Sequence, residues 1–309
     1  MSKLSVVVTI YKNEDNILPF YENFNSKIVP YIDDYEIIMV NDASPDNSWA
    51  IMKELAMKDS RVKIIKLMRN FGAVAASFTG IKYSTGDCVT LKAADLQEPE
   101  SLLIEMYNRW KQGARSVLAV REDRDDPLHT VIFSNIYYWL VQKMISSKMP
   151  RGGFDTYLID QSLAQLLVKQ NDNNSPITLQ LLWMGCGDEK VYYKRQKRII
   201  GKSSWTFSKK LKLFVDSFIG FSYIPIRFMT TIGLASAGLS FIYAIYMVIM
   251  HIFGRVDVKG FTTLVVLLAF FCGLILFSLG ILGEYVWRTL DSSRHRPISI
   301  VETTQNFDN

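Results

Sequence analysis

The stretch YEIIMVNDASPD, residues 35–46, sets the fold of the N-terminal two-thirds of the chain. Its first half, Tyr35–Val40, is an unbroken apolar run, which is typical of a strand buried on both faces of a sheet. Its second half changes abruptly to Asn, Asp, Ser and Pro, residues that favour turns. Helical spacing then continues to about Met57, so the stretch predicts one unit of an alternating α/β domain.

The same succession recurs along the first two hundred residues. The other predicted strands are 4–11, 62–67, 87–91 and 116–120, and the other predicted helices are 16–31, 74–83 and 100–112. Strands that alternate with helices form a parallel sheet with helices on both faces, and ligands bind outside the carboxyl ends of such strands. The loops that follow the strands are therefore expected to carry the function; they are 12–16, 41–46, 69–72 and 93–99.

The apolar residues concentrate near the C-terminal end. Two runs, 228–250 and 261–283, contain no Asp, Glu, Lys or Arg, and a helix of that length is about 35 Å long, enough to cross a bilayer. A pair of buried core helices is the alternative. The short connector 251–260 predicts a helical hairpin, and the small residues within the runs allow close helix packing and permit a homo-oligomer.

A basic segment precedes the first apolar run. Between Lys190 and Arg227 there are ten Lys or Arg residues and one acidic residue, Asp216, in a chain whose net charge is +5. Basic residues favour the cytoplasmic side, so the N-terminal domain and the C-terminal tail are expected there. Residues 208–222 have amphipathic helical spacing, which predicts either a helix in the membrane interface or an ordinary surface helix.

Composition excludes several classes of protein. The 309 residues are 49% hydrophobic, which excludes a disordered or collagen-like chain. Three widely spaced cysteines exclude a disulfide framework and show no metal-ligand spacing. The N-terminus has no signal-peptide pattern, and no strand ends in a dinucleotide fingerprint or a P-loop. No nucleic-acid partner is expected.

Polar residues after the predicted strands are the candidates for chemistry. Asp42 follows a strand and precedes a helix, so it either accepts a hydrogen bond from a uracil or ribose or caps the helix. Asp95 and Gln97 suit a hard divalent cation that bridges two phosphates, although Asp95 also fits a helix cap.

Two further groups of candidates lie after the fifth predicted strand. Arg121 and Arg124 either neutralise phosphate oxygens or belong to a solvated loop. Asp155 follows the Gly152–Gly153 turn, where it either faces the reactive centre or shapes the loop.

Six segments together resemble the GT-A glycosyltransferases of family 2, and more narrowly the bacterial polyprenyl-phosphate glycosyltransferases related to dolichol-phosphate mannose synthase. They appear in the family's order through nearly the whole chain. The segments are VTIYKNE (8–14), NDASPD (41–46), RNFG (69–72), ADLQEP (94–99), GILGEYV (280–286) and RPISIV (296–301).

The resemblance implies a fold and a reaction. The fold is a Rossmann-like GT-A domain with a mostly parallel sheet over residues 1–205, an amphipathic juxtamembrane helix over 206–226, a two-helix transmembrane hairpin over 227–285 and a cytoplasmic tail over 286–309. The reaction is transfer of one sugar, with inversion, from a nucleotide sugar, expected to be a UDP-sugar, to polyprenyl phosphate at the bacterial cytoplasmic membrane. Undecaprenyl phosphate is the expected acceptor, and Mg²⁺ or Mn²⁺ the expected cofactor. A membrane-anchored nucleotide-sugar-binding or scaffold protein with a degenerate site is the alternative.

The resemblance also implies roles for individual residues. The metal ligands would be Asp95 and Gln97. The catalytic group would be Asp95, Asp155, Arg121 and Arg124, with Asp155 orienting the sugar rather than removing a proton. The nucleotide would contact Thr9, Tyr11, Glu14, Asp42, Arg69 and Asn70. The lipid phosphate would contact Arg198 and Lys202.

Three departures from the family pattern bear on the substrate. Ala93 stands where the family usually has the first Asp of its D-A-D motif, so Asp95 and Gln97 must carry more of the cation site. Tyr157 and Gln161 replace two arginines, and in 201–205 the usual lysine is shifted.

Overall fold

The computed structural model describes residues 2–122, 128–170, 175–196, 207–253 and 260–307. The strands are β1 (Lys3–Ile10), β2 (Asp34–Asn41), β3 (Val62–Leu67), β4 (Cys88–Leu91), β5 (Ser116–Arg121), β6 (Phe154–Asp160), β7 (Glu189–Tyr193) and β8 (Val301–Gln305). The helices are α1 (Glu14–Lys27), the short η1 (Val29–Tyr31), α2 (Ser48–Lys58), α3 (Ala73–Lys82), α4 (Glu100–Lys111), α5 (Leu128–Met144), α6 (Gln161–Gln170), α7 (Ile177–Trp183), α8 (Phe207–Phe221), α9 (Ile224–Ile252) and α10 (Phe261–Ser293).

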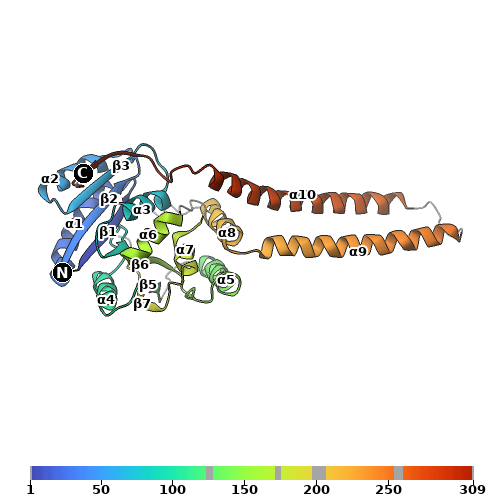
Figure 1. The fold of residues 1–309 in the computed structure, drawn as a ribbon, viewed down its shortest axis with the longest axis horizontal. Helices are drawn as coiled ribbons and strands as arrows, with labels where there is room; N and C mark the ends of the chain where they lie inside the picture. The colour runs from blue at the N-terminus through green and yellow to red at the C-terminus, as the bar shows by residue number, and fades with distance from the viewer. Residues whose placement is uncertain (1, 123–127, 171–174, 197–206, 254–259, 308–309) are drawn as a thin grey trace. The chain divides into compact units, whose positions relative to one another are not determined.

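The strands form a single sheet in the order β7-β5-β6-β4-β1-β2-β3-β8 (Figure 1). Strands β4, β1, β2 and β3 are parallel neighbours, so their carboxyl ends meet at one rim. Strand β6 lies antiparallel between β4 and β5, and β5 is parallel to β7. The sheet is thus mostly parallel, as predicted.

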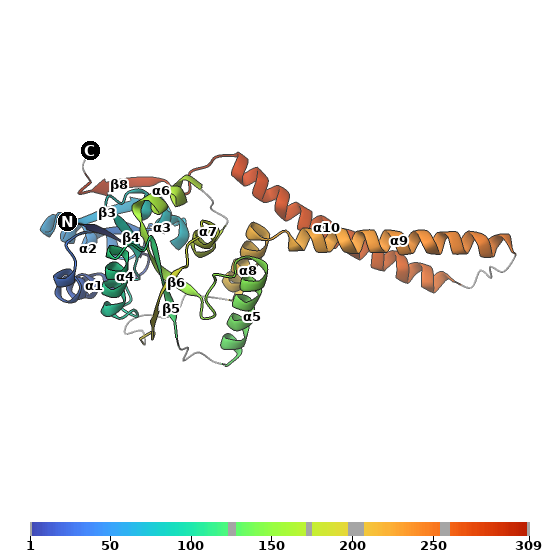
Figure 2. The same cartoon turned by 60° about the horizontal axis from the view of Figure 1, so that its bottom comes forward.

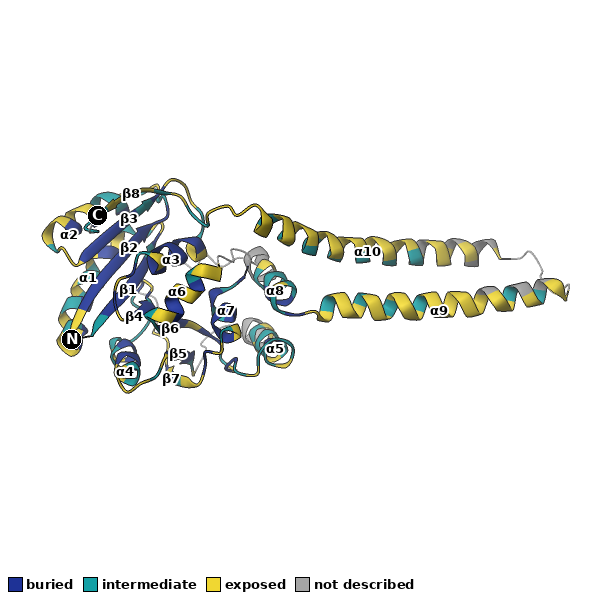
Figure 3. Cartoon of the chain, viewed as in Figure 1, coloured by how far each residue is buried: buried dark blue, intermediate teal, exposed yellow. Residues whose placement is uncertain are grey.

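Helices cover both faces of the sheet. Side chains of α1, α2 and α4 pack with alternate residues of β1 and β2, including Val6 and Met39, in one core cluster. Helix α3 covers the other face, where a Cβ on Gly80 would lie 2.2 Å from Val7 Cγ1. Glycine at this position therefore lets α3 approach β1 closely. Strands β1 to β5 are buried almost throughout (Figure 3), and this explains why their sequences are nearly continuous apolar runs.

A buried carboxylate, Glu36, links the strands at their amino ends, the rim opposite to the carboxyl ends. Glu36 accepts hydrogen bonds from Ser5 Oγ at 2.6 Å and Thr85 N at 2.7 Å, and its Oε2 lies 2.9 Å from both Lys3 Nζ and Lys63 Nζ. Burial alone would raise the pKa of Glu36, but these donors outweigh it and lower the pKa to about 2. Glu36 is therefore ionised and links β1, β2, β3 and the turn before β4.

Three strands were not predicted from the sequence. Strands β6 and β7 form the half of the sheet around β5, and β8 pairs antiparallel with β3. The C-terminal residues consequently belong to the same compact unit as the N-terminal domain: one unit comprises 1–217 and 297–309, and the other 218–296. The predicted tail, 286–309, thus contributes the end of α10 and an edge strand.

The second unit consists of the end of α8 and two long helices, α9 and α10. The helices are long and apolar enough to cross a membrane over Ile224–Met247 and Val266–Ser293. None of the residues in their most apolar windows is buried, so they differ from the core helices of a soluble protein. Within this unit Tyr285 donates a hydrogen bond to the backbone oxygen of Ser222, at 3.2 Å.

Candidate active site

Each loop at the carboxyl rim of the parallel strands contains a residue with positive φ. Lys12, Ala43 and Leu96 follow β1, β2 and β4 with φ of 52°, 50° and 53°, and Gly72 follows β3 with φ of 96°. The left-handed conformation is unfavourable for residues other than glycine, and such strain concentrates at functional sites. The rim that the sequence singles out is therefore also where the backbone is strained.

The loops after β1 and β2 are interlocked. Ser44 Oγ accepts a hydrogen bond from Lys12 N at 2.7 Å and donates to Asp46 at 2.6 Å. Glu14, predicted to contact the nucleotide, accepts a hydrogen bond from Asn47 N at 2.7 Å, at the start of α2. Glu14 thus helps to fix the shape of the rim.

Asp42 does not cap the helix that follows it. One carboxylate oxygen accepts from Phe71 N at 2.7 Å and the other from Gly72 N at 2.9 Å, so Asp42 holds the loop after the neighbouring strand. Its side chain is buried, and burial raises its pKa while the two backbone donors and Arg69 oppose that rise. Asp42 therefore fastens the loop that leads into α3, and its predicted contact with a uracil or ribose stays a prediction.

The other predicted nucleotide contacts are more accessible. Tyr11 is 44% exposed, with Lys12 Nζ 5.7 Å from its ring centroid. Arg69 and Asn70 are exposed, and the Arg69 guanidinium lies 4.0 Å from the ring centroid of Phe71. Thr9 is half-buried near the end of β1. These residues leave an aromatic ring and a cation at the rim beside the loop that Asp42 holds.

The turn that contains Asp95 is fastened to the chain after β7. Gln196 N donates to Gln97 O at 2.9 Å, and Gln97 Nε2 donates to Gln196 O at 3.3 Å. Arg195 Nη2 donates to Gln97 Oε1. Asp95 is buried and accepts a 3.4 Å hydrogen bond from Gln97 N. The contact places the guanidinium of Arg195 beside the predicted metal-binding turn.

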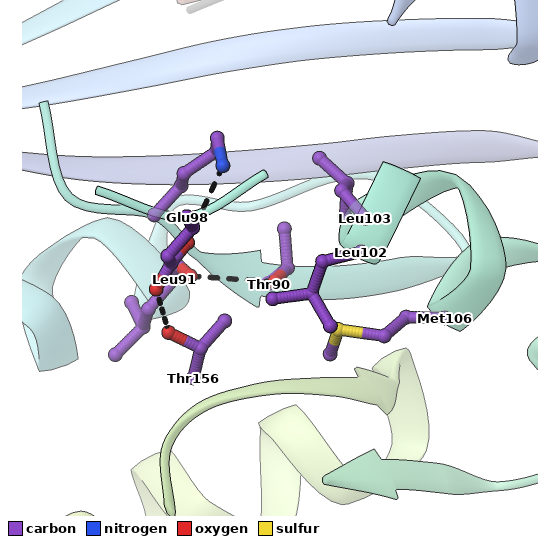
Figure 4. A pocket seen from close by; sticks show the side chains of 8 residues that line it. Thr90, Leu91, Glu98, Leu102, Leu103, Met106 and Thr156 are labelled. Atoms are coloured by element: carbon purple, nitrogen blue, oxygen red, sulfur yellow. Dashed lines mark hydrogen bonds and ion pairs between the residues drawn. The ribbon is translucent and has the colours of Figure 1, made fainter. Parts of the chain in front are cut away.

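Glu98 connects this turn to β6 (Figure 4). It accepts a hydrogen bond from Thr156 Oγ1, and its Oε2 lies 3.3 Å from Lys92 Nζ. Both side chains of the Lys92–Glu98 ion pair are nearly inaccessible, at 4% and 10% exposure. Burial raises the pKa of Glu98, and Lys92 opposes that rise. The pocket around them leaves no space for a water molecule, so the ion pair is closed to solvent.

Arg121 and Asp155, both predicted to be catalytic, form an ion pair. They lie on the paired strands β5 and β6, and Arg121 Nε also donates to Tyr193 OH on β7, at 3.4 Å. Burial works to lower the pKa of Arg121, but Asp155 and Tyr193 outweigh it, so the pKa is raised. Asp155 is about half exposed. It stands next to Thr156, so the pair lies close to the turn that carries Asp95 and Glu98.

The donor set at the Asp95 turn fits a hard divalent cation only with help from a substrate. Among the described residues, no group of three or more His, Cys, Asp or Glu could hold a metal. The carboxylate of Asp95 and the amide oxygen of Gln97 are oxygen ligands, as Mg²⁺ prefers, and Mg²⁺ is often held by one or two carboxylates plus substrate phosphates. Gln97 Oε1 accepts a hydrogen bond from Arg195 in this structure, so the predicted metal ligands Asp95 and Gln97 stay a prediction.

Some predicted residues lie outside the described part of the chain, and some contacts were missed. Arg124, Arg198 and Lys202 fall in undescribed segments. Neither Arg195 nor Glu98 was predicted individually as a site residue, although Arg195 lies within the basic segment before the first apolar run and Glu98 within the quoted ADLQEP segment. Arg195 could have been found only by recognising β7, because it stands two residues after that strand ends.

Comparisons with known proteins identify the family of the chain. Residues 5–153 match the family Glycosyl transferase family 2. The chain is 32% identical over 304 residues to the bactoprenol glucosyl transferase of Shigella phage SfV, covering 97% of this chain and 98% of that protein. It is 30% identical over 306 residues to the uncharacterized glycosyltransferase YkcC of Bacillus subtilis (strain 168), covering 99% and 95%.

A solved structure supports the fold. Mannosyl-3-phosphoglycerate synthase from Rubrobacter xylanophilus is similar with a TM-score of 0.51 and 14% identity, over 70% of this chain and 71% of that one. The predicted GT-A fold is confirmed. The chain belongs to glycosyl transferase family 2.

Proposed function

We propose that this protein transfers one sugar from a nucleotide sugar, a UDP-sugar, to polyprenyl phosphate at the cytoplasmic face of a bacterial membrane. The observation that carries the proposal is the extent of the similarity to the phage SfV bactoprenol glucosyl transferase. It covers nearly the full length of both chains, so it includes the two long apolar helices as well as the GT-A domain.

The membrane assignment is supported by exposure. Both long helices expose large apolar side chains over most of their surface. So large an exposed apolar area is unfavourable in water and is typical of a membrane contact. Residues on both sides of the hairpin belong to one compact unit that shares the β-sheet. An even number of crossings is therefore required, because β3 and β8 must lie on the same side. The basic residues before α9 favour the cytoplasmic side.

The rim after β1, β2 and β3 supports nucleotide binding. Tyr11 offers an exposed ring against which a base can stack, and Arg69 offers a cation to a phosphate. Thr9 and Asn70 offer hydrogen-bonding groups beside them. Asp42 and Glu14 support the site mainly by fixing the loops, since their carboxylates already accept backbone hydrogen bonds.

The Asp95 turn supports binding of the diphosphate. Asp95 and, once Arg195 releases it, Gln97 would hold Mg²⁺ or Mn²⁺, which would act as a Lewis acid toward the leaving diphosphate. Arg195 lies at hydrogen-bonding distance of Gln97 and is suited to a phosphate by its planar donors.

The transfer step follows from the charges involved. An oxygen of the lipid phosphate attacks the anomeric carbon of the sugar, the bond from that carbon to the diphosphate breaks, and the nucleoside diphosphate leaves. The nucleophile is already ionised at pH 7, so no general base is needed and a single displacement inverts the anomeric carbon. Asp155 orients the sugar and Arg121 stabilises the developing charge. Arg124 is proposed to act with Arg121 at the leaving diphosphate, and Arg198 and Lys202 are proposed to supply positive charge near the lipid phosphate.

The experiment uses the purified full-length protein in detergent with undecaprenyl phosphate and a panel of radiolabelled nucleotide sugars, beginning with UDP-glucose. Label that enters the organic phase with one donor supports the proposal and identifies the sugar. Undecaprenol without its phosphate is the acceptor control, and Asp95→Ala is the site control. Full activity of Asp95→Ala would contradict the metal assignment.

The alternative is a membrane-anchored nucleotide-sugar-binding or scaffold protein, favoured by Ala93 in place of an expected carboxylate. It predicts UDP-sugar binding by calorimetry with no transfer to lipid from any donor. That result would overturn the proposed reaction.

A further inference from the structure

Asp155 lies in a β-bulge of strand β6. The pairing of β6 with β5 shifts register after Thr156, and the next residue of β6 that has a partner in β5 is Phe154. Asp155 is therefore an extra residue in β6. A bulge bends its strand and changes the direction of the extra side chain, and bulges are common beside active sites. The direction of the Asp155 carboxylate, which pairs with Arg121, thus depends on this bulge.

The backbone ladder on the other side of β6 ends before the bulge. Strand β6 lies between β4 and β5, and α4 packs against it (Figure 2). In the described part of the chain, the ladder between β4 and β6 ends at the pair Thr90 and Leu158. Backbone pairing with β4 therefore does not hold the residues at the bulge, and a strand without such pairing is prone to shift.

Buried side chains make the connection where this ladder ends. Thr156 Oγ1 donates a hydrogen bond to Glu98, and Glu98 Oε2 lies 3.3 Å from Lys92 Nζ (Figure 4). Lys92 directly follows β4 and Glu98 lies just before α4, so the ion pair spans the turn that contains Asp95. Lys92 and Thr156 are buried, and no space is left for a water molecule around them. Water cannot replace the hydrogen bond of Thr156 if that bond is lost.

These contacts connect the bulge to the turn at the end of β4. We propose that Lys92, Glu98 and Thr156 are positioning residues for Asp155, and we call these three the bulge anchor. The ion pair holds the Thr156 hydroxyl, and Thr156 fixes the bulge that directs the neighbouring Asp155 carboxylate toward the sugar. The inference rests on the proposed function, in which Asp155 orients the sugar.

Thr90 offers a matched control for Thr156. Its Oγ1 donates a hydrogen bond to the backbone oxygen of Tyr157 at 2.7 Å, so it is a second buried threonine hydroxyl that bridges β4 and β6. Thr90 lies in the regular ladder, where backbone pairing with Leu158 already fixes the register. Removing its hydroxyl is therefore expected to lower stability without moving Asp155.

Kinetics of the full-length protein in detergent test the proposal. Valine keeps the β-branched shape of threonine and removes the hydroxyl, whereas serine keeps the hydroxyl. The variants are Thr156→Val, Thr156→Ser and Thr90→Val. Thermal melts first establish that each variant is folded. The kcat and the KM for the nucleotide sugar found active in the transfer assay are then measured at saturating undecaprenyl phosphate.

The expected result is a loss of kcat that is specific to Thr156→Val. A displaced orienting group should lower kcat by about tenfold or more with little change in KM, because catalysis is sensitive to small errors in position. Thr156→Ser should restore most of the kcat, and Thr90→Val should keep it. A kcat of Thr156→Val equal to that of Thr90→Val would overturn the proposal. A loss that serine does not restore would assign the effect to packing of the methyl group and would also overturn it.

Hydrogen exchange tests the bulge anchor without any substrate. Amides of residues 153–157 are expected to exchange faster in Thr156→Val than in the wild-type protein, and at the wild-type rate in Thr90→Val. Unchanged exchange in Thr156→Val would overturn the anchor. If the wild-type protein transfers no sugar from any donor, the proposed function fails, while this measurement still decides whether the anchor holds the bulge.

Discussion

Replacing Asp42 by asparagine separates a structural role of this carboxylate from a direct role in binding the nucleotide. Asp42 accepts two hydrogen bonds, from Phe71 N at 2.7 Å and Gly72 N at 2.9 Å, through different oxygens. Asparagine has one acceptor oxygen, so one of the two N–H groups must face an NH₂ donor. The substitution preserves size and removes one acceptor.

The magnitude follows from these two bonds. Losing the charge weakens the retained bond by roughly 1 kcal/mol, and leaving the other donor unsatisfied costs about 1–3 kcal/mol. Burial raises the pKa of Asp42, which shows that the carboxylate also carries a desolvation penalty that asparagine avoids. The expected net loss is about 2 kcal/mol, which lowers the Tm by roughly 4–8 °C for a domain of this size.

Hydrogen exchange of the loop after β3 is the most direct assay. In Asp42→Asn, the amides of Phe71 and Gly72 are expected to lose protection, while a control substitution of the exposed Asp15 by asparagine leaves them unchanged. Affinity for UDP is measured on the same proteins. Unchanged exchange and Tm together with weaker UDP binding would refute the structural reasoning and make Asp42 a ligand only.

Three further predictions concern stability. The pKa of Glu36 is lowered to about 2 in the folded protein, so its ionised carboxylate stabilises the fold fully at pH values above its ordinary pKa. This stabilisation, roughly 3 kcal/mol, is lost as the pH falls from the ordinary pKa toward 2. Thermal melts taken across that range measure the loss, and Glu36→Gln should abolish this pH dependence. At neutral pH Glu36→Gln should also lower the Tm, because Lys63 is left buried without its partner. Ala43 has φ of 50°, a left-handed conformation that costs about 1 kcal/mol of strain. Ala43→Gly relieves this strain but gives the unfolded chain greater freedom, so the Tm should stay unchanged or rise, whereas Ala43→Val should lower it. The reverse order would show that the left-handed conformation is not a source of strain. Glu98→Gln should destabilise the protein by about 3 kcal/mol in urea titrations because the buried Lys92 loses its ion-pair partner, and a loss smaller than about 1 kcal/mol would mean that Thr156 and Lys92 rearrange freely.

The parallel half of the sheet could be predicted because burial on both faces leaves a simple pattern. Strands such as Tyr35–Val40 are unbroken apolar runs, and each ends in a polar loop. The order of loops along one rim then follows from the parallel topology. This is why Asp42, Arg69 and Asp95, which are far apart in the sequence, could all be assigned to one site.

Strands β6, β7 and β8 could not be predicted for the opposite reason. Strand β8 has the sequence VETTQ, and three of its five residues are exposed. Its place in the sheet depends on pairing with β3, more than two hundred residues earlier, and on Asn306 Nδ2, which donates to Val62 O at 2.8 Å. Such pairing leaves no local periodicity, and the same holds for β7, which positions Arg195.

The strands that were missed explain how the two halves of the site are connected to the hairpin. The chain enters the hairpin through α8, which packs on α5 beside the half of the sheet that carries Arg121. It returns through β8, where Met68 N donates to Ile300 O at 3.0 Å at the start of the Arg69 loop. The Arg121–Asp155 side of the site is thus fastened to the segment that enters the hairpin, and the proposed nucleotide side to the segment that leaves it. A rearrangement at either end of the hairpin would act on a different half of the site. Substitutions in α8 are therefore expected to lower the rate of sugar transfer at saturating donor, whereas substitutions in β8 are expected to weaken the binding of UDP measured by calorimetry.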